Sequence, residues 1–236
     1  MSLQVTAQAG RLVTQSDSQK TMQAPQHQIV RRPQRPTCNR CQRPQTSCIC
    51  RWITPTAHAA EVLILQHPLE VREAKNSARL LHLSLPGSRL VVGEAFDDAA
   101  LAALLPLPPY TVLLYPPTAY PGHAAPAPLD LATLADPQNV RLVVLDATWR
   151  KSRKMLHLSP ALQRLPRFTL AELPASRYAI RKAHQPGQLS TLEATCAALA
   201  QLEGETTRFQ PLLAAFDGFV AQQGAYIEKG AVAPVQ

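Results

Sequence analysis

From residue 61 onward, short apolar runs alternate with amphipathic stretches along this chain of 236 residues. The apolar runs predict strands at 61–66, 88–93, 111–115 and 140–146, and a short one at 167–170. The amphipathic stretches predict helices at 73–85, 97–105, 190–204 and 211–229, and a further apolar-periodic stretch runs from the 140–146 strand to residue 162. Because the strands lack strict alternation and are separated by helices, the pattern predicts an α/β fold with a mostly parallel sheet covered by helices.

The sequence divides into three parts, of which the first two lie before this pattern of strands and helices. Residues 1–34 are rich in Gln, Ser and Thr, which predicts a disordered tail. A cysteine-rich module follows at 35–55, and the α/β domain is expected at 56–230. Within that domain, 106–128 holds eight of the 22 prolines and predicts an irregular surface loop.

The short length of the apolar runs also bears on where the protein is expected in the cell. None approaches the roughly 18 residues that a membrane span needs, and the N-terminus lacks the apolar region of a signal peptide. We therefore expect a cytoplasmic protein without membrane association.

The formal charge of +8 is concentrated at one end of the chain. Residues 1–51 contain eight Arg and Lys but one Asp, so they carry +7, and the remainder carries +1. This basic N-terminal part suits a polyanion such as RNA. A solvated tail that keeps the protein soluble is the alternative interpretation.

The segment TCNRCQRPQTSCIC contains Cys38, Cys41, Cys48 and Cys50, with the spacing C-x2-C, six residues, C-x-C. Such pairs can turn two thiolates toward one tetrahedral ion. The alternative is two disulfides, but a bridge between Cys48 and Cys50 is sterically awkward, and the expected compartment is reducing. The spacing therefore favours a structural zinc ion with four protein ligands. Cys196, within a predicted helix, is expected to be a small core residue.

Parallel sheets bind ligands at the carboxyl ends of their strands, so the residues that follow each apolar run are candidates for a site. Asp146 ends the 140–146 strand, where it could cap the next helix or act as a general base or polar anchor. Trp149 follows as a core aromatic or as a surface on which a base stacks. His67 directly follows the predicted strand at 61–66 and has either a structural or a functional role.

Two basic segments accompany these candidates. Arg150, Lys151, Arg153 and Lys154 form a run that is either a solvated helix face or a phosphate contact. Further along, Ser190 and Thr191, with Glu193 close behind, are typical of a helix N-cap and its first-turn acid. The open N-terminus of that helix could also receive a ligand carboxylate.

The cysteine cluster, H-P-x-E, D-x-T-W and R-K-x-x-x-P-x-x-L-S-T-x-E-A occur in that order, and together they resemble the DTW-domain family over roughly residues 36–225. The resemblance implies a SPOUT-like α/β core and leaves open whether the chain end forms a trefoil knot. It also implies S-adenosylmethionine as co-substrate and transfer of its aminocarboxypropyl group to a uridine in tRNA.

The resemblance assigns expected roles to individual residues. Asp146, with Thr148 and Trp149, would form the catalytic group, with Asp146 as either base or orienter of the uracil. The cofactor-binding set would be Leu114, Tyr115, Pro116, Leu145, Ser190, Thr191 and Glu193. The substrate-binding set would be His67, Glu70, Arg150, Lys154, Arg177, Tyr178, Arg181 and Lys182. An RNA methyltransferase of the same fold and a non-catalytic zinc-ribbon RNA-binding adapter remain alternatives, and the oligomeric state is open.

Overall fold

Five parallel strands form the centre of the computed structural model, which describes residues 36–118, 121–171, 176 and 189–231, with side chains up to residue 226. The strand order is β2-β1-β4-β3-β5, and each neighbouring pair is parallel. The strands are β1 (Glu61–Gln66), β2 (Arg89–Val92), β3 (Tyr110–Leu114), β4 (Val140–Asp146) and β5 (Arg167–Phe168). The predicted α/β class and parallel sheet are confirmed.

Helices connect the strands and cover the sheet. The α-helices are α1 (Ala78–Ser84), α2 (Asp98–Leu104), α3 (Leu131–Leu134), α4 (Trp149–His157), α5 (Pro160–Arg164), α6 (Thr191–Glu203) and α7 (Gln210–Ala231). Short 3₁₀ turns are η1 (Gln45–Ser47), η2 (Cys50–Trp52), η3 (Pro68–Glu70) and η4 (Pro137–Asn139). Within the described residues, no helix is both long and apolar enough to cross a membrane.

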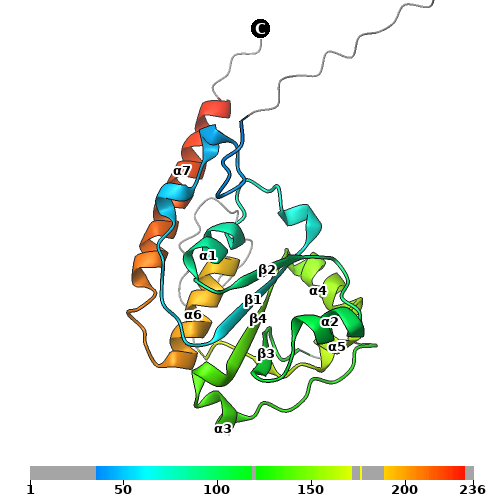
Figure 1. Ribbon diagram of the computed structural model, residues 1–236. Coiled ribbons are helices and arrows are strands. Elements are labelled where there is room, and N and C mark those ends of the chain that lie inside the picture. Colours follow the sequence, from blue (N-terminus) through cyan, green and yellow to red (C-terminus); the bar gives the residue numbers. More distant parts are fainter. Residues whose placement is uncertain (1–35, 119–120, 172–175, 177–188, 232–236) are drawn as a thin grey trace, which may run out of the picture. The chain divides into compact units, whose positions relative to one another are not determined.

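Side chains of β1 alternate between two hydrophobic clusters on opposite faces of the sheet. Val62 and Ile64 belong to a cluster with α1, α6 and α7, whereas Leu63 and Leu65 pack with α2, α4 and α5. Figure 1 shows α1, α6 and α7 on one side of the sheet and α2, α4 and α5 on the other. This arrangement explains the continuous apolar runs, because strands buried on both faces need no polar positions.

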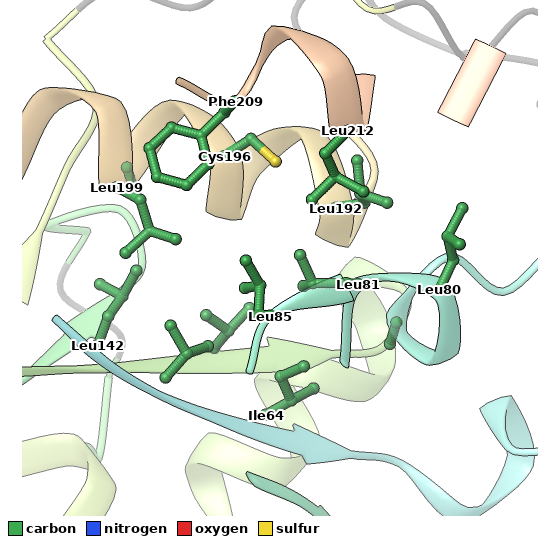
Figure 2. Packing of buried hydrophobic residues seen from close by; sticks show 14 of the residues in the cluster. Ile64, Leu80, Leu81, Leu85, Leu142, Leu192, Cys196, Leu199, Phe209 and Leu212 are labelled. Carbon is green, nitrogen blue, oxygen red and sulfur yellow. The ribbon is translucent and has the colours of Figure 1, made fainter. Parts of the chain in front are cut away.

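The larger cluster buries α1 between the sheet and α6. Figure 2 shows Leu85, the residue directly after α1, between Ile64 on the strand side and Leu192 on the helix side. Cys196 is 1% exposed in the same cluster, near Phe209, so its predicted role as a core residue is confirmed. Helix α6 ends at Glu203, and Gly204 caps it with a φ of 65°, the left-handed conformation that glycine favours after a helix.

The cysteine segment packs into the same core. Cys41 and Ile49 are fully buried members of the larger cluster. The indole of Trp52 in η2 lies against Gly218 of α7, where an added Cβ would meet the ring at 2.1 Å. Gln222 of α7 accepts a hydrogen bond from Trp52 Nε1 at 2.5 Å and donates one to the Cys48 carbonyl at 3.1 Å. Helix α7 therefore connects the cysteine segment to the body of the fold.

Three predictions about elements need correction. The helix expected at 73–85 begins at Ala78, because the Asn76 side chain accepts the N–H groups of Ala78 and Arg79. The proline-dense stretch 106–128 contains the regular strand β3, which the prolines flank. The apolar-periodic stretch to residue 162 is two helices, because Ser159-Pro160 starts α5 separately. Helix α3, which was not predicted, starts at Leu131 and is capped by Asp130, whose carboxylate accepts two backbone N–H groups.

Candidate active site

The neighbouring strands β1 and β4 lie at the centre of the sheet, and the chain leaves their carboxyl ends in opposite directions across the sheet. Gln66, the last residue of β1, is in register with Asp146, the last residue of β4. From β1 the chain continues to β2 on one side, and from β4 it continues to β5 on the other. Their connecting helices α1 and α4 pack on opposite faces, so a crevice opens between the two strand ends.

Three neutral groups donate hydrogen bonds to the Asp146 carboxylate in this crevice. Gln66 Nε2 lies 2.8 Å and Asn76 Nδ2 lies 2.6 Å from Oδ2. Thr191 Oγ1 lies 2.7 Å from Oδ1. Because a carboxylate offers about four acceptor positions, one position remains for a further donor.

Burial raises the pKa of Asp146 above its ordinary value of 3.8, although its hydrogen bonds oppose that shift. The residue is 4% exposed, and the nearby Glu70 carboxylate adds a smaller upward contribution. Trp149, three residues further along the chain, is itself 50% exposed. A raised pKa brings this carboxyl closer to the range in which it can accept a proton near neutral pH.

Asp146 lines a cavity of about 270 Å³ that contains charges of both signs. The lining consists of Glu70, Glu73, Lys75, Asn76, Ser77, Asp146, Thr148, Lys151, Ser190 and Thr191. Lys151 Nζ lies 2.7 Å from Glu70 Oε1, and Glu70 is buried. The cavity therefore suits a small polar ligand that carries both a positive and a negative group.

The start of α6 forms one wall of the cavity and also contains a complete capping box. The Ser190 hydroxyl accepts the Glu193 N–H, and the Glu193 carboxylate accepts the Ser190 N–H. Ser77 Oγ accepts the Leu192 N–H at 3.3 Å. The capping interpretation of Ser190 and Glu193 is confirmed. Ser190 also lines the cavity, whereas Glu193 is not among the lining residues. Thr191 reaches across to Asp146.

Helix α4 begins beside the cavity, but Asp146 does not cap it. Its N-cap residue is Thr148, which lines the cavity. Trp149 is the first helical residue, and its ring meets Tyr115 edge-on, with the centroids 5.7 Å apart. Trp149 therefore has an exposed surface beside the site, and it is not a core aromatic. Arg150 is exposed, and Lys154 forms an ion pair with Glu94 at 2.8 Å.

Several other predicted residues lie away from the cavity lining. Leu114 ends β3, the strand beside β4, and Tyr115 and Pro116 follow it. Leu145 packs partly into the smaller cluster. The Tyr115 hydroxyl lies 3.4 Å from Ser152 Oγ. These positions form the neighbouring part of the same sheet edge.

Both ring nitrogens of His67 have hydrogen-bond partners within the protein, as in a residue with a structural role. Its Nδ1 accepts the Leu69 N–H at 3.1 Å, so the ring Nε2 can donate to Glu94 Oε1 at 3.0 Å. The side chain is buried, and Glu94 also binds Lys154. His67 thus joins the end of β1 to α4.

Four predicted substrate residues, Arg177, Tyr178, Arg181 and Lys182, lie outside the described residues. Between them and β5, Ser176 donates to the Glu193 carboxylate at 3.2 Å.

The structure also assigns residues to the site that the sequence did not indicate. Gln66 and Asn76 hold Asp146, and Glu73, Lys75 and Ser77 line the cavity. Gln66 could have been found, because it is the last residue of a predicted strand. Asn76 could not, because it lies in a stretch that resembled a helix.

The four sulfurs of the cysteine segment fit a tetrahedral metal ion. All four lie within 4.8 Å of one another, with 3.6 Å between Cys38 and Cys50 and 3.7 Å between Cys41 and Cys48. A zinc ion with bonds of about 2.3 Å requires sulfur separations of about 3.8 Å, whereas a disulfide requires about 2.05 Å. The described cysteines are free thiols.

Hydrogen bonds within the cluster favour the thiolate form of Cys38, which is the form that binds a cation. The backbone N–H groups of Cys41 and Arg40 lower the pKa of the Cys38 thiol to about 6. Burial raises the pKa of the Cys50 thiol to about 12. Near neutral pH, a bound cation would therefore be needed to keep Cys50 as a thiolate.

The chain is similar in sequence to several known proteins. The chain is 34% identical to tRNA-uridine aminocarboxypropyltransferase 2 of Drosophila melanogaster over 179 residues, which are 72% of this chain and 68% of the fly protein. It is 32% identical to the protein of the same name from Mus musculus over 78% of this chain. It is 30% identical to tRNA-uridine aminocarboxypropyltransferase A of Arabidopsis thaliana over 51% of this chain.

The matched region covers 63% of the mouse protein and 50% of the Arabidopsis protein, so the chain spans under two thirds of these two relatives. No solved structure matches this chain. The family model for the DTW domain matches residues 35–224, which include both the cysteine cluster and the cavity. The chain therefore belongs to the DTW domain family.

Proposed function

We propose that this protein transfers the 3-amino-3-carboxypropyl group of S-adenosylmethionine to N3 of a uridine in tRNA. The names of the related fly, mouse and plant proteins support the reaction class. The observation on which the proposal depends is that Asp146 and Thr191, from distant parts of the chain, meet at one polar cavity. A fold that only bound RNA would not need a buried carboxylate held by neutral hydrogen-bond donors at that position.

S-adenosylmethionine supplies an electrophilic methylene next to its sulfonium. The uracil N3 attacks that carbon, so an N–C bond forms as the C–S bond breaks and methylthioadenosine leaves. Asp146 takes the N3 proton through its remaining acceptor position or, as the alternative, only orients the uracil. Because N3 lies on the pairing edge, the uridine must be unpaired or turned out of its stack.

The charges of the cavity suit the amino acid end of the donor. Its ammonium would lie near Glu70 and Glu73, and its carboxylate near Lys75 and Lys151. The Ser190 hydroxyl is engaged by the Glu193 N–H, so the start of α6 would contribute mainly through the Thr191 N–H. The cavity of about 270 Å³ is smaller than the roughly 300 Å³ at which ligand pockets usually start. The adenosine would therefore extend toward Leu114, Tyr115, Pro116 and Leu145.

The exposed face of α4 is the proposed contact with tRNA. Arg150 and Trp149 are exposed beside the cavity, and Lys154 can exchange Glu94 for a phosphate. Arg177, Tyr178, Arg181 and Lys182 are proposed to extend this contact. The site would lie in the cytoplasm, where tRNA is available.

A structural zinc ion is proposed for Cys38, Cys41, Cys48 and Cys50. It would hold the segment on α7 and, with four protein ligands, would leave no position for a reacting group. A SPOUT-like topology, with or without a knot, also remains a prediction, because 172–175 and 177–188 lie outside the described residues.

The deciding experiment mixes the protein with unmodified tRNA and S-adenosylmethionine labelled either in the methyl or in the carboxyl carbon. Carboxyl label entering the RNA, with release of methylthioadenosine, supports the proposal. Entry of methyl label would indicate an RNA methyltransferase instead. Binding of tRNA without either product would indicate a non-catalytic adapter. Mass spectrometry of the nucleosides then identifies the modified uridine.

A further inference from the structure

Arg43 lies between two of the metal-ligating cysteines, and the cysteine loop fixes its backbone. The Cys38 N–H donates to the Arg43 carbonyl at 2.8 Å, and the Gln42 N–H donates to the Cys38 carbonyl at 2.8 Å. The Arg43 guanidinium lies over the Phe219 ring of α7, 5.3 Å from the ring centroid. Its position is therefore set by the cysteine loop on one side and by the core on the other.

The guanidinium contacts the wall of the cavity. Nη1 donates to the Ala74 carbonyl at 2.6 Å, and Nη2 donates to the Asn76 carbonyl at 2.9 Å. A second contact runs parallel to it, from Arg79 Nη2 to Gln42 Oε1 at 2.6 Å. Residues 73–77 contribute four members of the cavity lining.

This part of the wall has little regular structure of its own. Residues 71–76 lie between η3 and the N-cap residue Ser77 of α1, outside any strand or helix. The Glu73 carbonyl accepts the Asn76 N–H in a turn, and the helix ladder begins only at the Ser77 carbonyl, which accepts the Leu81 N–H. A planar guanidinium that donates to two carbonyls fixes both position and direction, which a single ammonium cannot do. The Asn76 carbonyl is held by Arg43, while its side chain donates to Asp146 at 2.6 Å.

We propose that Arg43 is a positioning residue through which the cysteine module holds residues 74–76, and with them the Asn76 amide, against Asp146. The cysteine module then acts on the reaction through the geometry of the cavity wall, independently of any contact it makes with RNA. This inference about the reaction rests on the proposed function, whereas the inference about the wall does not.

The test compares Arg43→Met with Arg40→Met in the zinc-loaded protein. Methionine keeps the packing over Phe219 but removes both donors. Arg40 lies in the same loop, its side chain is exposed, and its replacement removes the same charge. Hydrogen exchange of peptides covering 72–80 is measured first, because it does not depend on activity. We expect exchange in Arg43→Met to rise about tenfold, and no change in Arg40→Met.

Kinetics provide the second measurement. In Arg43→Met, we expect kcat for the transfer to fall about tenfold, with KM for tRNA within about twofold of the wild type. Unchanged exchange in Arg43→Met would overturn the proposal. A raised KM for tRNA in both variants, with kcat unchanged, would also overturn it, because that result indicates an RNA contact.

The experiment also covers two other outcomes, an Arg43→Met protein that does not fold and a wild type that shows no transfer. If Arg43→Met does not fold, Arg43→Lys decides the question, because it keeps the charge but not the two-donor geometry. Exchange of residues 72–80 should then rise at least about threefold, and wild-type exchange would reject the proposal. If the wild type transfers no group to tRNA, the proposed function fails, while the exchange experiment still tests how the wall is held.

Discussion

Thr191 Oγ1 lies 2.7 Å from Asp146 Oδ1 and joins the first residue of α6 to the last residue of β4. The two residues are 45 positions apart in the chain. Thr191 contributes the hydroxyl of the first residue of the helix, and Asp146 contributes a buried carboxylate whose pKa is raised. Their contact closes one side of the polar cavity and makes Asp146 the first target for substitution.

Asp146→Asn is expected to abolish most of the transfer activity without unfolding the protein. The amide removes the proton acceptor, which is worth about 10² to 10⁴ in rate for a general base. The three neutral donors can still find partners after rotation of the Gln66 and Asn76 amides. A single-turnover assay with labelled donor measures the rate, and thermal unfolding provides the control. A rate within threefold of the wild type would leave Asp146 as an orienter only.

The free energy of unfolding should depend on pH through Asp146. Because the folded-state pKa is raised, the folded protein binds more protons than the unfolded chain between 3.8 and the raised value. The contribution of Asp146 to stability therefore increases as the pH falls through the folded-state pKa, and it is complete below 3.8. The difference between wild type and Asp146→Asn, measured by urea unfolding across acidic pH, should show this slope. Activity should decrease over the same range as the carboxylate takes up a proton.

Lys151→Met is expected to weaken binding of the donor. Lys151 is one of two lysines that line the cavity, and it pairs with the buried Glu70. Loss of one charged contact should raise KM for S-adenosylmethionine about tenfold, with KM for tRNA nearly unchanged. Arg153→Met is the matched control, because Arg153 is exposed on the same helix. Equal effects of both substitutions would argue against a specific role of the cavity lysine.

Removal of one cysteine ligand should release the metal and destabilise the α7 contact. Cys48→Ser is expected to reduce bound zinc well below one ion per chain and to lower the melting temperature, since structural zinc contributes directly to folding. Trp52 fluorescence should change, because its Nε1 donates to Gln222 beside Cys48. Cys196→Ala, outside the cluster, should keep the metal. Full zinc content in Cys48→Ser would disprove the four-cysteine assignment.

Two glycines of α7 should respond to alanine in opposite directions. At Gly218 an added Cβ would meet the Trp52 ring at 2.1 Å, so Gly218→Ala should cost about 1–3 kcal/mol. At Gly224 nothing lies within 4 Å, so Gly224→Ala should gain up to about 1 kcal/mol from helix propensity. Denaturant unfolding of both variants measures the difference. Equal effects would show that the cysteine segment does not pack on α7 as described.

The pattern of apolar runs predicted the fold well because strands buried on both faces leave a clear signal in the sequence. Strand β4 was predicted with its observed ends, Val140 and Asp146. The start of α1 was wrong because the polar side chain of Asn76 competes for the first backbone N–H groups, which periodicity does not register. Helix α3 was missed because it contains a single turn.

By itself, the sequence determined the parallel α/β class, the four-cysteine cluster and the position of Asp146 at the carboxyl end of a strand. These features depend on local spacing and on the position of a residue at the end of a strand. Only the tertiary structure decided that Gln66, Asn76 and Thr191 hold Asp146, and that Lys151 pairs with Glu70. Such contacts join segments separated by up to 81 positions, and they form because the strand order places β1 beside β4 and packing brings α6 to their ends.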